Sequence, residues 1–439
     1  MPVTKINNPH LYALIAGEMS GDTLGAGLMS AILRHDPQAR FIGVGGPRMI
    51  ELGLATAFRM EAIAVMGVAD VMRSLLSILR LRRRLTRMLL EARPCVLIGI
   101  DSPDFNLSVE RCLKRHGIPT LHYVSPSVWA WREGRMKTIR ASCDEVLALL
   151  PFEKEYYDRV DMPCTYVGHT LASRIPFEVS MEGARERLSL YQSSIERIRG
   201  KVVGVMAGSR LGEMERMVPV YTRACRLLKQ DMEDVCFISV APTHEMAVAL
   251  KDLWLEHAPD LSFTIYVGST HDVIAATDVV LLTSGTIALE AMLLKKPMCV
   301  CYRVGPLSAM IARRMLKVSM FSLPNLLARR EIVTELIQEH CTPENIFHEV
   351  KKLLTSDNLL MRKEFLSIHQ QIRLNSDELA AQAVFRRVNL ALQERQAQLR
   401  EEDRRLNDMA RSALEKAERR EAARKGGGGA AATAAAKKL

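Results

Sequence analysis

The sequence predicts an α/β protein with two doubly wound parallel sheets, and two observations support this prediction. Short apolar runs alternate with amphipathic segments, which is the pattern of strands and crossover helices in a parallel sheet. The pattern is interrupted once, by a turn-rich stretch at residues 168–176, and then repeats. Two consecutive domains with a cleft between them are therefore the simplest architecture, and a single large sheet is the alternative.

The first series of expected strands ends near residue 150. Helical patterns follow three of these strands, at residues 22–35, 47–52 and 107–116. The expected strands are LYALIAG (11–17), FIGVGG (41–46), VLIGI (96–100), TLHYVS (120–125) and EVLALL (145–150). We assign this series to a first domain, residues 1–170.

The second series of expected strands belongs to a second domain, residues 171–355. Its strands are KVVGVMAGS (201–209), VCFISVA (235–241), SFTIYVG (262–268), DVVLLTS (278–284) and PMCVCYR (297–303). Residues 356–392 have helical periodicity without strands, which predicts helices that pack back across both domains. Residues 393–439 are charged nearly all round and end in a Gly/Ala-rich run, so we expect a charged helix and a mobile tail.

The composition is that of a cytosolic enzyme. Of the 439 residues 48% are apolar, yet no apolar stretch reaches the roughly 18 residues that a membrane-spanning helix needs. The apolar stretch at residues 11–17 is too short for a secretory signal, so we expect a protein that is neither exported nor integral. Nine scattered cysteines without metal-ligand spacing predict reduced thiols.

The net charge of +10 does not indicate a nucleic-acid partner. From Arg386 onward the chain has 14 Lys and Arg against 8 Asp and Glu, so this end supplies +6 of the total. Because the excess does not form one broad face, and because the common RNA- and DNA-binding signatures are missing, no nucleic acid is expected to bind.

Acidic side chains follow two of the expected strands. Asp101 comes directly after VLIGI, with Asp104 and Asn106 close behind, and Glu18 and Asp22 follow LYALIAG. The carboxyl ends of strands in an open α/β sheet border the ligand crevice, so we predict that Asp101 is a general base that deprotonates a hydroxyl group. The alternative is that Asp101 only caps the following turn. Asp101 and Asp104 lack a third ligand nearby, so no metal site is expected.

Two strands of the second series end in small residues that open a helix, which predicts a nucleotide site. The loops are Gly208-Ser209-Arg210 and Ser284-Gly285-Thr286. Small residues let a phosphate approach backbone N–H groups at a helix N-terminus, and Arg210 can add a charge-assisted contact. Glu290 lies on the same helix face as Thr286 and is placed to bind a ribose diol. The sequence has neither the Walker pattern nor GxGxxG, which disfavours a P-loop NTPase or a dinucleotide oxidoreductase.

Residues 66–90 combine an apolar helical face with a cluster of arginines. Such a helix suits the interface of an anionic membrane, and the alternative is a core helix followed by a solvated basic turn. The residues of the predicted membrane or acyl-chain surface are Val68, Met72, Leu75, Leu76, Leu79 and Arg80.

Nine segments occur in the order typical of one family, from about Leu11 to Val384. They are AGEMSGDTLGAGL, GVGGPRM, AVMGVADV, GIDSPDFN, LHYVSPSVWAWREGR, LPFEKEYY, VGHTL, SGTIALEAML and SLPNLLARRE. On these segments the chain resembles the lipid-A-disaccharide synthases. The resemblance implies a two-Rossmann (GT-B) glycosyltransferase that joins UDP-2,3-diacylglucosamine to 2,3-diacylglucosamine 1-phosphate with inversion and release of UDP. It further implies no required cofactor, peripheral attachment to the cytoplasmic face of the inner membrane, and a homodimer with exchanged C-terminal parts.

The resemblance also implies roles for individual residues. Asp101 is the expected base for the acceptor 6-hydroxyl, and Glu18 the acid on the acceptor side. The residues expected to support the acceptor site are Ser20, Gly21, Asp22, Asp104, Asn106 and Ser125. The residues expected to bind the UDP donor are Gly208, Ser209, Arg210, Ser284, Gly285, Thr286, Glu290, Tyr302, Arg303 and Asn325.

Two other functions stay open on the sequence. A UDP-sugar epimerase would use the same fold without a lipid acceptor, and a noncatalytic membrane or RNA adaptor would use the arginine cluster and the basic tail. The family pattern accounts for nothing after about Arg386, and Met19 stands where many relatives have a smaller residue.

Overall fold

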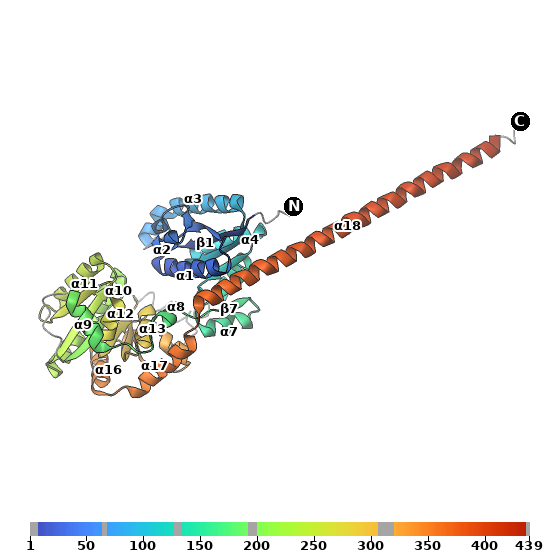
Figure 1. The fold of residues 1–439 in the computed structure, drawn as a ribbon. Coiled ribbons are helices and arrows are strands. Elements are labelled where there is room, and N and C mark those ends of the chain that lie inside the picture. The colour runs from blue at the N-terminus through green and yellow to red at the C-terminus, as the bar shows by residue number, and fades with distance from the viewer. Residues whose placement is uncertain (1–7, 64–67, 127–132, 192–199, 306–319, 436–439) are drawn as a thin grey trace.

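The computed structural model of the chain describes residues 8–63, 68–126, 133–191, 200–305 and 320–435 (Figure 1). It contains two separate parallel sheets, each with helices packed against it, and a C-terminal helix whose outer part projects far from both. The prediction of two doubly wound sheets is confirmed, and the alternative of a single large sheet is wrong.

The first sheet has the strand order β3-β2-β1-β4-β5-β6-β7, and every neighbouring pair is parallel. Its strands are β1 (Asn8–Ala16), β2 (Arg40–Val44), β3 (Leu54–Thr56), β4 (Pro94–Ile100), β5 (Thr120–Tyr123), β6 (Glu145–Ala148) and β7 (Cys164–Tyr166). Its helices are α1 (Met19–His35), α2 (Pro47–Glu51), η1 (Met60–Ala62), α3 (Val68–Ala92), α4 (Pro103–Arg115), η2 (Glu133–Arg135), α6 (Met136–Ser142) and α7 (Pro151–Arg159). The edge strands β3 and β7 were not predicted, because three partly exposed residues form no apolar run.

The second sheet has the order β10-β9-β8-β11-β12-β13 and is also fully parallel. Its strands are β8 (Lys201–Met206), β9 (Val235–Ala241), β10 (Phe263–Val267), β11 (Val279–Thr283), β12 (Met298–Tyr302) and β13 (Thr334–Ile337). The helices around it are α8 (Thr170–Arg174), α9 (Met181–Tyr191), α10 (Leu211–Asp231), α11 (His244–His257), α12 (Thr270–Ala276), α13 (Thr286–Leu293), α15 (Leu323–Ala328), η3 (Gln338–His340) and α16 (Pro343–Thr355). The edge strand β13 was likewise not predicted.

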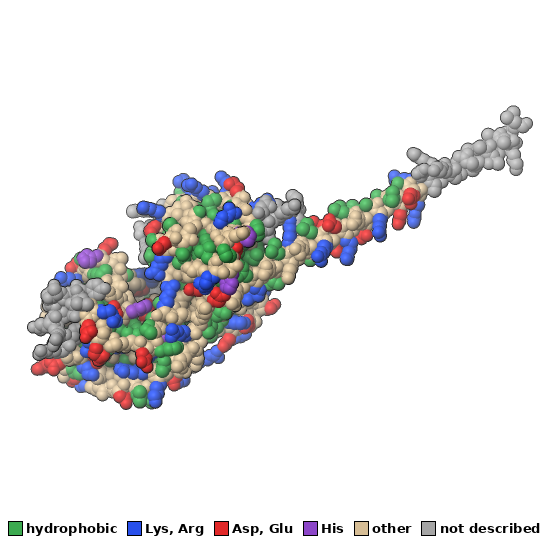
Figure 2. Space-filling view, in the orientation of Figure 1, with side chains coloured by type: hydrophobic (Ala, Val, Ile, Leu, Met, Phe, Trp, Pro, Cys, Tyr) green, Lys and Arg blue, Asp and Glu red, His purple; other side chains and the backbone are tan. Residues whose placement is uncertain are grey.

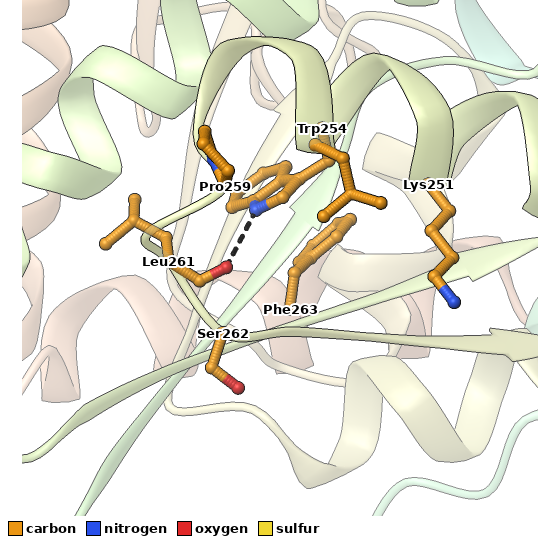
Figure 3. Close-up of a pocket in the computed structure, with 7 residues that line it drawn as sticks. Lys251, Trp254, Pro259, Leu261, Ser262 and Phe263 are labelled. Atoms are coloured by element: carbon orange, nitrogen blue, oxygen red, sulfur yellow. Dashed lines mark hydrogen bonds between the residues drawn. The ribbon is translucent and has the colours of Figure 1, made fainter.

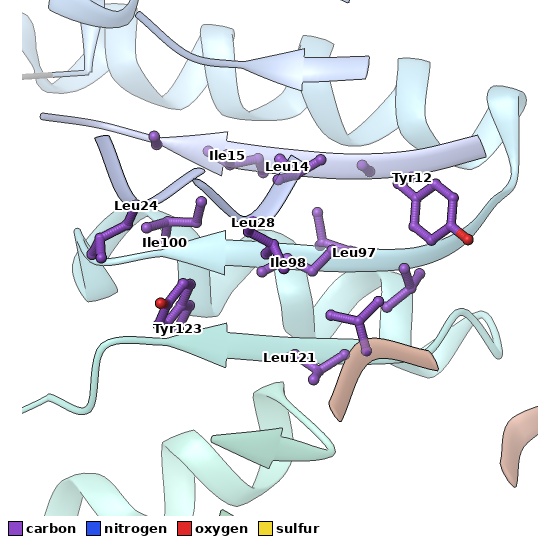
Figure 4. Packing of buried hydrophobic residues seen from close by; sticks show 14 of the residues in the cluster. Tyr12, Leu14, Ile15, Leu24, Leu28, Leu97, Ile98, Ile100, Leu121 and Tyr123 are labelled. Carbon is purple, nitrogen blue, oxygen red and sulfur yellow. The ribbon is translucent and has the colours of Figure 1, made fainter. Parts of the chain in front are cut away.

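The central strands of the first sheet are buried on both faces. All seven residues of β4 are buried, as are the last six of β1, because helices cover both sides of a parallel sheet. Figure 4 shows how side chains of these strands, such as Leu14 and Ile98, pack with Leu28 of α1. Burial of each such side chain contributes about 1.5–3 kcal/mol, so the positions where these strands end are firmly fixed.

Each sheet contains one point where the direction of the chain connections reverses. In the first sheet this switch point lies between β1 and β4, and in the second it lies between β8 and β11. At a switch point the two following helices leave toward opposite faces, so the loops after the two strands separate and border a crevice. The predicted loops at Glu18, Asp101, Arg210 and Thr286 all follow these four strands.

The C-terminal helices connect the two cores. Helix α17 (Leu359–Ile372) buries Phe365 and Ile368 in the core of the second sheet, and α18 (Ser376–Ala435) then buries Ala380 and Val384 in the core of the first. The expected helices over residues 356–392 are thus α17 and the first part of α18. The break at residues 373–375 lets the chain cross from one core to the other, and there the Ser173 hydroxyl donates a hydrogen bond to the Leu374 carbonyl.

Helix α18 continues through Gly426–Gly429 to Ala435, and the mobility of this end stays a prediction. Extending an existing helix costs far less than starting one, and alanine is the best helix former, so the Ala-rich end can extend the helix past the glycines. Among the residues that the structure describes, no helix is both long enough and apolar enough to cross a membrane.

The two parts of α18 should contribute very differently to stability. Truncation after Leu392 should change the free energy of unfolding by no more than about 0.5 kcal/mol, because the side chains from Gln393 to Arg420 are almost all exposed. Val384→Asp should lower it by at least about 2 kcal/mol, because it places a charge in the core. Urea unfolding of both variants measures this, with Ala397→Asp on the exposed part as control. A large loss on truncation, measured at protein concentrations where the chain is monomeric, would contradict the assignment.

Candidate functional site

The loops after β1 and β4 touch at the switch point of the first sheet. A Cβ atom added at Gly17 would lie 2.4 Å from the Ser102 hydroxyl oxygen, so any larger residue at Gly17 would push the two loops apart. Glu18 follows Gly17, and Asp101 precedes Ser102. The structure therefore brings together two of the predicted acids, one on each side of the switch point.

The buried side chain of Asn106 fastens these two strand ends to each other. Its amide nitrogen lies 2.8 Å from the Asp101 carbonyl, 3.2 Å from the Ile100 carbonyl and 3.3 Å from the Ile15 carbonyl. One donor group thus contacts the ends of both β1 and β4. Asn106 was predicted as a supporting residue, and its contacts fit the role of holding the Asp101 backbone in place.

Backbone strain gathers at this edge of the sheet. Asp101 and Ser102 have φ angles of +53° and +43°, and Val124 after the neighbouring strand β5 has +78°. Left-handed conformations are costly for residues other than glycine, above all for a β-branched valine. Hydrogen bonds hold them: the Asp101 N–H donates to the Tyr123 carbonyl at 2.8 Å, and the Val124 N–H donates to the Leu147 carbonyl at 3.0 Å. Strain of this kind is typical of functional sites.

The two acids remain accessible in this arrangement. Asp101 is half-buried, while Glu18 is exposed and its side chain does not cap α1. Ser20 in the first turn of α1 is also exposed. Asp101 thus combines a fixed backbone with a reachable carboxylate, which is what a general base requires.

Other predicted supporting residues have structural partners instead. The buried Asp22 carboxylate accepts hydrogen bonds from the backbone N–H groups of Arg48 and Met49, both at 3.0 Å, and so caps α2. The Ser125 hydroxyl lies 3.0 Å from the Tyr157 hydroxyl in a buried position. Gly21 packs α1 closely on Ala16, and exposed Asp104 forms an ion pair with Arg135. These four residues shape the site from outside rather than face it with free groups.

A buried acid and histidine behind the Asp101 loop were not predicted as a pair. Glu110 lies one turn after Asn106 on α4, and its carboxylate is 2.7 Å from the His122 ring on β5. Both side chains are fully buried, and burial raises the pKa of the Glu110 carboxyl. No spacing rule links these two residues, so only the packing of α4 on β5 reveals their contact.

The loop after β8 opens α10 and carries Arg210. Gly208 has a φ of +118°, and a Cβ there would clash with Glu213, so the chain itself requires this glycine. The Glu213 carboxylate accepts hydrogen bonds from the Ser209 N–H and the Arg210 guanidinium, both at 3.2 Å. An internal carboxylate thus holds the helix N-terminus where an anion is favoured. Glu213 was not predicted, although its position one turn into the helix is a common capping position.

The loop after β11 opens α13 and leaves its first residues exposed. The Ser284 N–H donates to the Cys301 carbonyl at 2.9 Å, which fixes the end of the strand. Gly285 and Thr286 are exposed, and a Cβ added at Gly285 would meet no described atom within 4 Å. Neither the packing nor the extended backbone at Gly285 requires a glycine. The space beside it is therefore free for a ligand at the helix N-terminus.

Glu290 on α13 is paired with a histidine that the sequence did not indicate. The His271 ring nitrogen on α12 lies 3.1 Å from the Glu290 carboxylate. This hydrogen bond raises the pKa of His271, against the opposing effect of partial burial, and Asp272 adds to the rise. Asp272 itself forms an ion pair with Arg187 of α9. Glu290 is thus anchored beside the exposed loop, as a residue that binds a diol would need to be.

Both amide atoms of the predicted donor residue Asn325 form hydrogen bonds within the chain. Its amide nitrogen donates to the Val333 carbonyl at 2.9 Å and to Glu335 at 2.7 Å, and its amide oxygen accepts the N–H groups of Ile332 and Val333. Buried Asn325 therefore has no amide atom left for a ligand in this conformation. Glu335 on β13 was not predicted, and it also accepts the Phe321 and Ser322 N–H groups.

The segment around Asn325 lies at the junction of the two sheets. Leu323 and Leu327 of α15 pack against the cores of both, and Arg329 after this helix forms an ion pair with Glu155 of α7. Tyr302 and Arg303, at the end of β12, are half-buried. Asn325 of the predicted donor site thus lies in the helix that contacts both cores.

A pocket elsewhere in the second sheet is not part of this site. It is lined by residues of α11 and the start of β10, where the Trp254 and Phe263 rings stack 3.7 Å apart (Figure 3). The Trp254 ring N–H donates to the Leu261 carbonyl at 3.2 Å. Because β10 begins at Phe263, this pocket lies at the amino ends of the parallel strands, opposite the predicted loops. No group of three His, Cys, Asp or Glu side chains arranged to hold a metal ion occurs in the described part of the chain.

Comparison with known proteins gives one consistent result. Residues 12–384 match the family model described as Lipid-A-disaccharide synthetase. The chain is 44% identical over 381 residues to the lipid-A-disaccharide synthase of Vibrio campbellii, which covers 87% of this chain and 99% of that protein.

Two solved structures share the fold at low sequence identity. One is described as the glycotransferase of kitacinnamycin, with a TM-score of 0.56, 15% identity, and coverage of 86% of this chain and 99% of that one. The other is a UDP-GlcNAc 2-epimerase from Neisseria meningitidis bound to UDP-GlcNAc, with a TM-score of 0.52, 11% identity, and coverage of 86% and 98%. These likenesses establish the two-sheet architecture alone.

The pairing of His271 with Glu290 predicts a measurable titration. Because the carboxylate raises the pKa of His271, Glu290→Gln should lower that pKa toward or below its ordinary value near 6.5. The pair stabilises the fold at pH values below the pKa that His271 has in the unfolded chain. This contribution is lost as the pH rises through the higher pKa that His271 has in the folded chain. NMR titration of the histidine rings measures the shift, with His271→Gln to assign the signal. An unchanged His271 pKa in Glu290→Gln would disprove the pairing.

Proposed function

Because the chain belongs to the lipid-A-disaccharide synthase family, we propose that the loops at its two switch points form one active site, with the acceptor on the first sheet and the donor on the second. The acceptor is 2,3-diacylglucosamine 1-phosphate and the donor is UDP-2,3-diacylglucosamine. The observation that carries the proposal is the placement of Asp101 and Arg210 after strands at the two switch points, where α/β sheets bind ligands.

In the proposed reaction the Asp101 carboxylate takes the proton of the acceptor 6-hydroxyl. The hydroxyl oxygen attacks the anomeric carbon of the donor from the face opposite UDP, the bond from that carbon to the UDP oxygen breaks, and the configuration inverts. Asn106 and the strained backbone at Asp101 and Ser102 hold the base in place before the acceptor arrives. Glu18, across the contact between Gly17 and Ser102, completes the acceptor side.

The leaving diphosphate gains its stabilisation from groups that are already oriented. The N-termini of α10 and α13 present backbone N–H groups, and Arg210 is 71% exposed on its side chain, so it can exchange Glu213 for a phosphate. Fixed donors aimed at developing charge lower the barrier without reorganisation, and we propose no cofactor beyond them. Glu290, anchored by His271, binds the ribose diol. Asn325 shapes the donor side through the backbone that it holds.

The family membership favours transfer over epimerisation, and a product assay tests this. The full chain incubated with both substrates should give the disaccharide 1-phosphate and UDP, detected by mass. The donor alone should stay unchanged, whereas an epimerase would convert it. No disaccharide from an intact, folded chain would refute the proposed function.

Asp101→Asn should reduce kcat by at least about 100-fold, because positioned general bases contribute roughly 10²–10⁴-fold. The affinity for UDP should stay near that of the wild type, because Asp101 acts on the acceptor. Steady-state kinetics and UDP calorimetry separate the two effects.

Gly285→Ala is the control for Asp101→Asn, because it should affect UDP binding and not the base. It should leave thermal stability unchanged, because its Cβ meets no described atom, and it should weaken UDP binding because it fills the space beside α13. Wild-type turnover in Asp101→Asn would remove Asp101 from the role of base.

We further propose that α3 lies on the inner face of the inner membrane. In the part of α3 whose side chains are described, Leu76 is 68% exposed, Leu79 is half-buried, and Arg80, Arg83 and Arg84 are exposed. Val68, Met72 and Leu75 lie outside the residues whose side chains are described. An exposed apolar residue beside several arginines fits an anionic membrane surface, where each nearby basic residue contributes about 1 kcal/mol.

Serine at Val68, Met72, Leu75 and Leu76 should release the protein from anionic vesicles. Sedimentation with vesicles of phosphatidylethanolamine and phosphatidylglycerol measures this. Serine at Leu359 and Leu360, which are 51% and 79% exposed elsewhere on the surface, is the matched control. Equal loss of binding in both variants would argue against α3 as the membrane surface.

We also propose a homodimer with exchanged C-terminal parts. The support is the short crossing at residues 373–375, since α18 could make the same core contacts with the first sheet of a second copy. Exchange of an identical element through a hinge loop is a low-cost route to a dimer.

A further inference from the structure

In the part of the chain that the structure describes, the side chains of α18 from Gln393 to Arg420 are almost all exposed. The helix leaves the body after Leu392 and projects away from both sheets (Figure 1). The family model ends at residue 384, so the proposed transferase activity does not account for this segment. Figure 2 shows hydrophobic side chains along one edge of the projecting helix, among charged ones.

The hydrophobic side chains form a row with a spacing of seven residues. The row consists of Leu392, Leu399 and Leu406, which are 36%, 41% and 63% exposed. The preceding position of the row is Phe385, which is half-buried and packs edge-on against Tyr12 and His35. We call these three leucines the leucine row. It continues outward from an apolar contact that the helix already makes with the body.

A lone helix of this composition has little to stabilise it. Helical stability in proteins comes chiefly from packing of an apolar face, and exposed ion pairs contribute little. In the projecting segment Glu401 pairs with Arg404 and Arg405, at 3.9 Å and 3.2 Å. Leucines spaced seven residues apart lie along one face of a helix, where they can pack against an apolar row of another helix.

We propose that the leucine row packs against the leucine row of a second copy of this chain, with the two helices antiparallel and crossing near Leu399. The charges beside the row select this arrangement. Arg395 stands three residues after Leu392, and Glu402 stands three residues after Leu399. Antiparallel pairing about Leu399 places Arg395 of each copy beside Glu402 of the other copy. Leu392 then meets Leu406 of the second copy, and the two Leu399 side chains meet each other.

Other arrangements fit these residues less well. A parallel pair in register would set Arg395 against Arg395 and Glu402 against Glu402, which is repulsive. An anionic membrane would need basic residues on both flanks of the row, whereas Glu402 and Asp403 stand there.

Cysteine cross-linking in the full chain tests both the contact and its direction. Under mild oxidation by copper phenanthroline, Leu399→Cys should form a disulfide-linked dimer in high yield. The Leu392→Cys chain and the Leu406→Cys chain, each tested alone, should form at least fivefold less cross-linked dimer than the Leu399→Cys chain. When these two chains are mixed, they should cross-link with each other. Ala397→Cys, exposed on another face of the same segment, is the matched control, and the unmodified chain with its nine cysteines sets the background.

Charge reversal supplies an independent readout. In the Leu399→Cys chain, Glu402→Arg should lower the cross-linking rate several-fold, and the second change Arg395→Glu should restore it, because only antiparallel pairing rejoins opposite charges. Efficient linking of Leu392→Cys to itself would overturn the antiparallel arrangement. If Leu399→Cys cross-links no faster than Ala397→Cys, the pairing itself is overturned. The pairing is also overturned if anionic vesicles protect Leu399→Cys from a water-soluble maleimide while no cross-link forms.

Discussion

The parallel pairing of β1 with β4, and of β8 with β11, is the constraint on which the rest of the molecule depends. Parallel strands need crossover connections, and these connections have one preferred hand, so a reversal of strand order sends two neighbouring helices to opposite faces. The loops at that place separate and stay open. Buried apolar strands fix where these loops begin, so the sheets position the chemistry before any ligand arrives.

Buried polar groups then hold the loops in conformations that they would not adopt alone. Asn106 fastens two strand ends, Asp22 caps α2, and Glu335 with Asn325 organises the segment at α15. Each of these side chains forms hydrogen bonds with backbone groups, and these bonds offset the cost of burying a polar side chain. The groups left accessible at the same edges are Asp101, Glu18 and Arg210. Rigid supports are thus buried, and reactive side chains are not.

The C-terminal helices turn two sheets into one assembly. Helix α17 belongs to the core of the second sheet and α18 to the core of the first, while α15 contacts both. The residues that join the sheets therefore lie close to the predicted donor segment at Asn325. A change in the relative position of the sheets would move this segment as well. The outer part of α18 does not join the sheets, so it is available for contacts between copies.

The sequence alone determined the sheet pattern and the chemical type of each loop, because apolar runs, acids after strands and small residues before helices are local signals. It also identified the family through segments such as LHYVSPSVWAWREGR. Edge strands such as β3 and β7 gave no signal, since three residues form no periodic pattern. Tertiary structure alone decided which polar residues support and which are accessible. Asp22 and Ser125 have internal partners far along the chain, as do His271 with Glu290 and Glu110 with His122. Such partners meet only when helices pack on sheets, so spacing along the chain cannot reveal them.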